Sequence, residues 1–186
     1  MASTALGHLS DDAVLDLLAR SDESALAELY DRYGGPAYRL ALRIVRDTAL
    51  AQDAVQDAFL TAWRTAAGFD ARRGSVSTWL LTLVHRRAVD VVRREDRRRG
   101  VPLDDAPVPS GDATDETAET RELRRDVQSA LAQLSDLERE ALELAYYGGL
   151  SQSEIAEKLG VPLGTIKSRM FAGLARLRDA LGERAP

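Results

Sequence analysis

The sequence of 186 residues contains no cysteine, two methionines and two histidines, and aromatic residues make up only 5% of it. Without cysteine the chain can form neither a disulfide framework nor a thiolate metal site, which agrees with a reducing cytoplasm. No run of about 18 apolar residues occurs, so no membrane-spanning helix is expected. The N-terminal residues 1–18 include three aspartates, which a secretory signal would not carry. These absences predict a cytoplasmic protein.

Apolar residues (45%) and charged residues (30%) are present in the proportions of a soluble globular protein. Alanine, leucine, arginine, aspartate and glutamate dominate the composition, which favours helix. The net charge of −5 is unevenly distributed. Residues 1–99 carry a net charge of +1 and residues 121–186 a net charge of zero, whereas residues 100–120 carry six acidic and no basic side chains. The negative charge therefore belongs to one short segment.

The acidic segment 100–120 is predicted to be a flexible linker. Its three prolines prevent a continuous helix, and its few apolar residues cannot form a core. It would span about 70 Å when fully extended and about 25 Å as a coil. We therefore expect two small domains, residues 1–99 and residues 121–186, connected by this linker.

Apolar residues recur at helical spacing in both expected domains, and no alternating strand pattern of useful length occurs, so the predicted fold class is all-α. In the first domain a helix from Ala25 is expected to break at Gly34-Gly35-Pro36 and to resume after it. A further helix should start at Asp47 or Thr48. The next covers residues 77–98, and its predicted buried stripe consists of Leu80, Val84, Ala88 and Val91.

The second expected domain begins with a helix marked by Leu123, Val127, Ala130, Leu131 and Leu134. Ser135 and Ser151 are each followed three residues later by a glutamate. This is the reciprocal capping pattern of a helix start. The second domain is therefore also predicted to be helical.

Residues 151–178 predict a helix-turn-helix, the unit that many proteins place in the major groove of DNA. The first helix should end at Gly160 in the left-handed conformation, and Pro162 suits the first position of the second helix. The inward-facing residues of that helix are expected to be Ile166, Met170, Leu174 and Leu177. Its outward surface carries small and basic groups, and the candidates for contact with DNA are Pro162, Leu163, Gly164, Thr165, Lys167, Ser168, Arg169, Phe171 and Arg176.

Asp53 and Asp57 lie one helical turn apart on the exposed side of the third predicted helix, beside Gln56. Paired carboxylates can act as acid and base or bind a metal, but no third ligand, histidine or apolar pocket accompanies this pair. A solvated helix face and an acidic patch that docks on a basic protein remain as alternatives. No metal or cofactor is expected.

The loop of residues 68–75 and the helix after it combine aromatic and arginine side chains. Such a loop suits a single-stranded base that is stacked or flipped into a pocket, although a plain connection would fit it too. Residues 86–99 contain seven arginines and three acids, a pattern that favours nucleic-acid binding. The candidate residues are Phe69, Arg72, Arg73, Ser75, Ser77, Trp79, Arg86, Asp90, Arg93, Arg94 and Arg97.

Together these segments resemble an extracytoplasmic-function (ECF) sigma factor, the smallest architecture of the RNA polymerase sigma factor family. The resemblance covers nearly the whole chain, from about Ser24 to Leu181. The segments that carry it are 25–33, 53–63, 77–80 with Arg86 and Asp90, and 162–169.

The resemblance implies a role for each candidate surface. Asp53, Gln56 and Asp57 would dock on the clamp helices of the largest polymerase subunit. The loop and the fourth helix would open and read the −10 promoter element, and the helix over residues 162–178 would read the −35 element. The linker would thread towards the active-centre cleft and the RNA exit path. An anti-sigma protein, often membrane-anchored in this family, would hold the chain inactive near the membrane.

Two other classes of protein remain as alternatives. A stand-alone helix-turn-helix regulator would dimerise on a palindromic operator, but no coiled-coil heptad or ligand-pocket pattern supports it. A helical enzyme would need a catalytic motif, and the sequence has no Walker loop and no dinucleotide-binding, nucleophile-elbow or zinc-protease motif. The sequence favours a sigma factor that binds core RNA polymerase and initiates transcription at specific promoters without catalysing a reaction itself.

Overall fold

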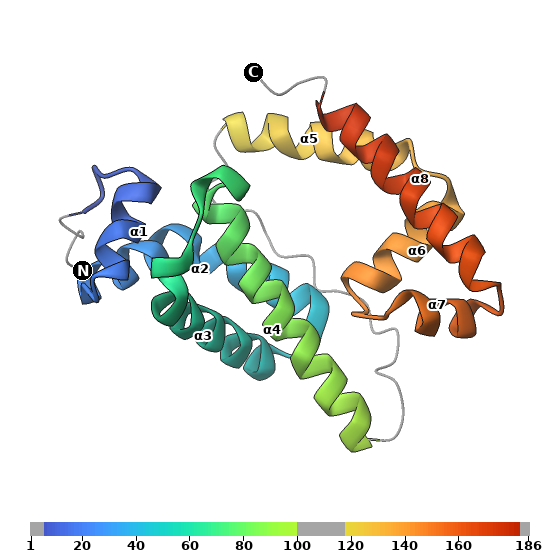
Figure 1. Cartoon of the computed structure of the whole chain (residues 1–186), viewed down its shortest axis with the longest axis horizontal. Coiled ribbons are helices and arrows are strands. Elements are labelled where there is room, and N and C mark those ends of the chain that lie inside the picture. The colour runs from blue at the N-terminus through green and yellow to red at the C-terminus, as the bar shows by residue number, and fades with distance from the viewer. Residues whose placement is uncertain (1–5, 100–117, 183–186) are drawn as a thin grey trace. The chain divides into compact units, whose positions relative to one another are not determined.

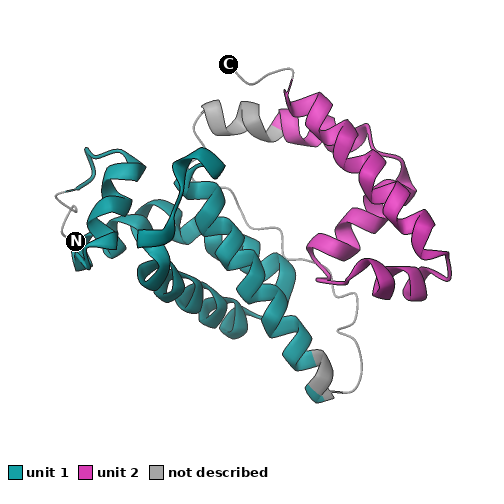
Figure 2. Ribbon diagram, in the orientation of Figure 1, with its two compact units in different colours: residues 1–110 teal, residues 111–186 magenta. Residues whose placement is uncertain are grey.

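The computed structural model describes residues 6–99 and 118–182, except for the side chains of residues 96, 97, 99 and 118–124. The described residues form eight α-helices and two short 3-10 turns without any strand (Figure 1). They belong to two compact units, residues 1–110 and 111–186 (Figure 2). The prediction of an all-α fold in two parts is confirmed. Within these described ranges, no helix is long and apolar enough to cross a bilayer.

Most of the predicted linker, up to residue 117, lies outside the described residues. Its last three residues are helical, because helix α5 begins at Ala118. The predicted linker thus overlaps the start of α5 by three residues.

Unit 1 is built on three helices that pack pairwise, with a fourth helix against all of them. Their contact faces are rich in alanine, and such small side chains let helix axes approach closely. The fully buried alanines include Ala25, Ala37, Ala41, Ala51, Ala58, Ala62 and Ala88. The described elements are α1 (Asp11–Ala19), α2 (Glu23–Val45), α3 (Thr48–Thr65), the 3-10 turns η1 (Ala66–Gly68) and η2 (Ala71–Arg73), and α4 (Val76–Arg99).

Helix α2 runs without a break through Gly34-Gly35-Pro36, so the predicted interruption is wrong. A proline in a helix interior costs about 3 kcal/mol, because it removes a backbone donor and crowds the preceding turn. One face of α2 stays buried on both sides of the proline, from Leu29 to Ala41, and this burial offsets the cost. Gly34 is itself buried, and a Cβ there would lie 3.3 Å from Cε1 of Tyr30.

Helix α1 was not predicted. It begins after Ser10, whose hydroxyl accepts a hydrogen bond from the backbone N–H of Ala13. Two aspartates occupy its first turn, and it buries Val14, Leu15 and Leu18 against the other helices of unit 1. The capping serine and the short apolar cluster after it are the signals from which α1 could have been found.

The predicted buried stripe of α4 is wrong at one position. Leu80, Val84 and Ala88 are buried as expected, but the next buried residue is Val92, whereas Val91 is partly exposed. The stripe keeps a spacing of four residues from Val76 onwards, as a ridge does when it packs between neighbouring helices. Asp47 caps α3 as predicted, since its carboxylate accepts a hydrogen bond of 3.0 Å from the N–H of Leu50.

Unit 2 contains α5 (Ala118–Ala132), α6 (Asp136–Tyr146), α7 (Gln152–Leu159) and α8 (Leu163–Gly182). Both predicted capping boxes are present. The Ser135 backbone N–H donates to Glu138 over 2.9 Å, and the Ser151 backbone N–H donates to Glu154 over 2.7 Å. Each serine hydroxyl accepts in return from the backbone N–H of its glutamate, so two donors at each helix start are satisfied.

Helices α7 and α8 form the predicted helix-turn-helix around buried Ile155, Ala156 and Ile166. Gly160 ends α7 in the left-handed conformation, at φ 63°. Pro162 directly precedes α8, which starts at Leu163, and its carbonyl accepts a hydrogen bond of 2.9 Å from the N–H of Thr165. The predicted position of this proline is wrong by one residue.

The inward face of α8 also differs from the prediction. Ile166 is buried and Met170 packs on the core, but Leu174 is 55% exposed. Gly173 is buried in its place, and a Cβ there would lie 2.9 Å from a methyl carbon of Leu142 on α6. The absence of a side chain at Gly173 lets α6 and α8 approach, which rotates Leu174 outward.

Candidate nucleic-acid interface

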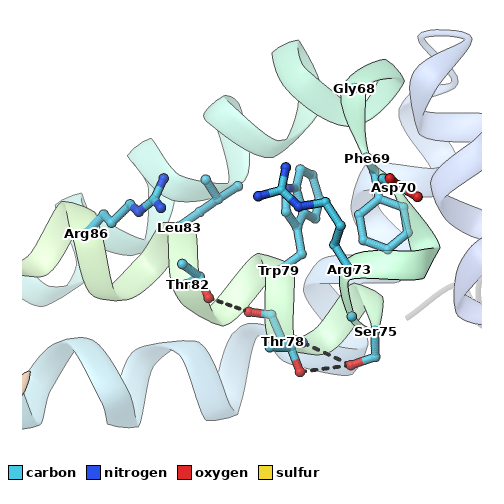
Figure 3. A pocket seen from close by; sticks show the side chains of 11 residues that line it. Gly68, Phe69, Asp70, Arg73, Ser75, Thr78, Trp79, Thr82, Leu83 and Arg86 are labelled. Carbon is cyan, nitrogen blue, oxygen red and sulfur yellow. Dashed lines mark hydrogen bonds between the residues drawn. The ribbon is translucent and has the colours of Figure 1, made fainter. Parts of the chain in front are cut away.

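A pocket of about 310 Å³ lies between the two 3-10 turns and the first half of α4 (Figure 3). The rings of Phe69 and Trp79 meet edge to face beside it, with centroids 5.5 Å apart. We call it the loop pocket. It is lined by Gly68, Phe69, Asp70, Arg73, Gly74, Ser75, Thr78, Trp79, Thr82, Leu83 and Arg86.

Hydroxyl groups and two guanidinium groups give the loop pocket a polar, positively charged side. Ser75 Oγ lies 2.9 Å from the hydroxyl of Thr78, and the Thr82 hydroxyl donates to the Thr78 carbonyl over 2.7 Å. Arg73 reaches the pocket from the loop and Arg86 from α4 (Figure 3). The pocket therefore offers aromatic surface to a planar group and positive charge to an anion.

The two arginines of the loop have different environments. Arg72 donates from Nε and Nη2 to the two carboxylate oxygens of Asp70, each over 2.9 Å. These side-chain hydrogen bonds lower the pKa of Asp70. Arg72 is turned to solvent and does not line the loop pocket, whereas Arg73 does. Arg72 and Arg73, which the sequence analysis placed in one group of candidates, thus have different surroundings in the structure.

The predicted arginine face of α4 points outward. Arg86, Asp90, Arg93 and Arg94 are exposed, and the side chain of Arg97 lies outside the described residues. Such a face could follow a nucleic-acid backbone away from the loop pocket, because it starts at Arg86 on the pocket wall.

Arg87 connects α4 to α3 beside that face. Its Nη2 donates to the hydroxyl of Thr61 over 3.1 Å. The same hydroxyl donates to the backbone carbonyl of Asp57 over 2.7 Å. A polar contact therefore joins the two helices in addition to their apolar packing.

Asp53, Gln56 and Asp57 are all exposed on the outer side of α3. In the described parts of the chain, no group of three or more histidine and acidic side chains could hold a metal ion. Gln56 also borders an apolar groove of about 670 Å³ between α2 and α3, which the sequence did not predict. Besides Gln56, this groove is lined by Glu23, Leu26, Ala27, Tyr30, Asp31, Phe59, Leu60 and Trp63.

Most of the residues predicted to contact DNA from α8 lie on its outward surface near the N-terminal end. The exposed side chains there include Lys167, Ser168 and Phe171, and Phe171 is 77% exposed. Thr165 and Arg169 are partly buried. The start of α8 is thus an exposed helix end, with the positive end of the helix dipole and basic side chains together.

Arg176 does not join this group. It follows Pro162 by 14 residues, which corresponds to about 21 Å along a helix. Its Nε lies 3.3 Å from Glu138 of α6. Hydrogen bonding to the backbone of Ser135 and the charge of Arg176 lower the pKa of Glu138. The structure therefore shows Arg176 in an ion pair within unit 2.

Six residues of the loop pocket are absent from the predicted candidates: Gly68, Asp70, Gly74, Thr78, Thr82 and Leu83. The last three could have been found from helical spacing. In Figure 3 Thr82 and Leu83 extend from the same side of α4 as Trp79 and Arg86. Residues three and four apart share a face of a helix.

The sequence matches two known families, sigma-70 region 2 over residues 29–98 and sigma-70 region 4 over residues 124–177. It is 42% identical over 173 residues to the ECF RNA polymerase sigma factor SigK of Mycobacterium tuberculosis strain H37Rv, covering 91% of this chain and 92% of that protein. Identity to SigK of Mycobacterium sp. strain KMS is 41% over 177 residues, with coverage of 92% and 90%. Rhodobacter sphaeroides SigE, solved in complex with the anti-sigma ChrR, is 29% identical over 92% of this chain and 97% of that chain, with a TM-score of 0.45.

Proposed function

Because the chain belongs to the ECF family of RNA polymerase sigma factors and directs the polymerase to promoters, we propose that its two units divide this task. Residues 1–99 dock on core polymerase and open the −10 element, residues 121–186 read the −35 element, and residues 100–120 connect them. The chain is an initiation factor of the cytoplasm and carries out no catalysis of its own. An anti-sigma protein keeps it inactive until its signal arrives.

The loop pocket is the observation that carries the −10 assignment. Opening duplex DNA costs a few kcal/mol per flipped base, and an extruded base needs a site that repays part of this cost. Stacking of a base on an aromatic side chain contributes about 1–3 kcal/mol. Phe69 and Trp79 supply that surface, and Arg73 and Arg86 lie where they can bind the adjacent phosphates.

The outer side of α3 is proposed to dock on core polymerase. Asp53, Gln56 and Asp57 form an exposed polar surface suited to a basic partner. The apolar groove begins at Gln56, so a partner that pairs with the carboxylates could also bury apolar area. Electrostatic attraction would then guide association, while the groove would add affinity.

The N-terminal end of α8 is proposed to read the −35 element. Lys167 and Arg169 supply positive charge, and Gly164 and Ser168 leave room for close approach to base edges. Unit 2 has no net charge over residues 121–186, so its affinity for free DNA should be low. Attachment of both units to one polymerase raises the effective concentration of each for its promoter element.

Docking through α3 is tested by reversing its charge. We expect Asp53→Lys/Asp57→Lys to abolish co-purification with core polymerase, because two attractive contacts become repulsive. Asp12→Lys/Asp16→Lys is the matched control, since it changes the charge equally on the exposed side of α1. Both variants should keep the far-UV circular dichroism of the wild type. Normal co-purification of the α3 variant would rule out this docking surface.

Base capture is tested by combining the substitution Phe69→Ala in the protein with an abasic site in the promoter DNA. A single abasic site is moved along the non-template strand of the −10 element, and initiation by the holoenzyme is measured at each position. One position should show an abasic penalty, the ratio of initiation on intact to abasic promoter, of about fivefold to a hundredfold. This penalty should disappear in Phe69→Ala, because no captured base remains to be lost. An equal penalty in the wild type and in Phe69→Ala would refute capture in the loop pocket.

A further inference from the structure

A compact polar cluster fastens α1 to α2. Arg32 Nη1 donates to Asp11 over 2.7 Å, and its Nε donates to Glu28 over 2.6 Å. Its Nη2 donates to the carbonyl of Leu6 over 3.2 Å. The Tyr33 hydroxyl donates to the second carboxylate oxygen of Asp11. We call this cluster the α1 latch.

Arg32 and Glu28 of the α1 latch are largely shielded from water, whereas 37% of the Asp11 side chain is exposed. Only 21% of the Arg32 side chain and 6% of the Glu28 side chain are exposed. Hydrogen bonds between charged groups are stronger than neutral ones, and they strengthen as the surrounding dielectric falls. Asp11 contributes the side chain of α1 to the latch, in addition to the apolar packing of Val14, Leu15 and Leu18.

A short series of contacts leads from α1 to the loop pocket. Helix α1 packs against the 3-10 turn η1, in which Ala66 is buried. The N–H of Phe69 donates to the carbonyl of Ala66 over 3.0 Å, so η1 fixes the position of the Phe69 backbone. Phe69 then packs edge to face on Trp79 in the pocket wall. The α1 latch itself lies outside the residues that line the pocket.

We propose that Asp11 and Arg32 are positioning residues for base capture, because the α1 latch holds η1 and thereby the aromatic wall of the loop pocket in place. The proposal rests on the proposed function of that pocket. The match to sigma-70 region 2 begins at residue 29, so α1 and Asp11 precede the part of the chain that the family match covers. Misplacement of a binding group by about 1 Å is enough to lose much of its contribution.

The test uses the full chain assembled with core polymerase and measures the abasic penalty defined above. Asp11→Ala removes the α1 side of the latch and leaves the Arg32–Glu28 pair intact. We expect it to lower the abasic penalty by about threefold to tenfold, the range set by one or two net hydrogen bonds. Affinity for core polymerase should not change, because the outer side of α3 is untouched. Asp12→Ala, on the same turn but exposed, should keep the full penalty.

Two further variants separate positioning from loss of structure. Asp11→Asn retains an acceptor for Arg32 and should restore most of the penalty. Tyr33→Phe removes one hydrogen bond and should give an intermediate value, which keeps the test valid if Asp11→Ala unfolds. An unchanged penalty in Tyr33→Phe and in any folded Asp11→Ala would overturn the positioning role, provided that Phe69→Ala abolishes the penalty. If Phe69→Ala leaves it unchanged, the pocket assignment fails instead.

Discussion

Gly173 offers a direct test of how unit 2 is held together. A Cβ at this position would lie 2.9 Å from a methyl carbon of Leu142 and 3.3 Å from Cβ of Glu138. Carbon atoms prefer a separation of about 3.5–4.0 Å. Gly173→Val adds two further methyl groups in the same space, so α6 and α8 must move apart. Overpacking of this kind costs about 1–3 kcal/mol.

The gain in helix propensity from glycine to valine offsets only a few tenths of a kcal/mol. The net destabilisation of unit 2 should therefore be about 1–2 kcal/mol. Gly164→Val is the matched control, because it lies in the same helix and nothing surrounds its Cβ within 4 Å. That control should leave unit 2 unchanged or slightly more stable.

Urea unfolding of the full chain can separate the two units. Both tryptophans, Trp63 and Trp79, lie in unit 1, so fluorescence reports that unit, while far-UV circular dichroism reports both. Gly173→Val should shift only the part of the dichroism transition that fluorescence does not follow. Initiation that depends on the −35 element should fall as unit 2 unfolds; Gly164→Val is a control for the unfolding curves only, because Gly164 lies on the surface proposed to read DNA. A dichroism curve identical to that of the wild type would show that α6 and α8 do not meet at Gly173.

Three other predictions follow from single side chains. Arg169→Ala should weaken −35-dependent initiation by about 1–3 kcal/mol if Arg169 contacts a base, and an equal loss on scrambled −35 elements would make it a phosphate contact. Burial and the hydrogen bond to Asp11 raise the pKa of Tyr33 to about 12, so its stabilisation should persist below pH 10 and be lost as pH rises towards 12. Ultraviolet titration should show a tyrosine that ionises near pH 12 in the wild type and is absent in Tyr33→Phe. The pKa of Glu138 is lowered by its hydrogen bonds to Ser135. The stabilisation that Glu138 contributes is therefore present above about pH 4.5 and is lost as pH falls through its folded pKa. A Glu138→Gln variant with the same acid sensitivity as the wild type would contradict this.

Local sequence signals predicted the helix starts well. The capping boxes at Ser135 and Ser151 and the cap at Asp47 depend on residues within three positions, so the sequence contains the whole interaction. The break at Pro36 was predicted by the same local reasoning and is wrong. At Pro36 the helix is stabilised by burial of α2 against other helices, and a short stretch of sequence does not reveal this burial.

The candidate surfaces were predicted unevenly for a similar reason. Aromatic and arginine residues identified the loop and α4, but Arg72 and Arg73 differ only because Asp70 binds the first of them. The outward rotation of Leu174 depends on how closely Gly173 approaches Leu142 across the unit. The α1 latch joins Asp11 to side chains 21 and 22 positions later. Such contacts follow from the tertiary fold and produce no periodic pattern in the sequence.

Buried alanines and the hydrogen bond between Arg87 and Thr61 hold α3 and α4 together, so the distance between their outer surfaces is fixed within unit 1. In the proposed function, α3 carries the surface that docks on the polymerase and α4 carries the pocket for the extruded base. The separation from the polymerase to the first melted position is then built into the protein.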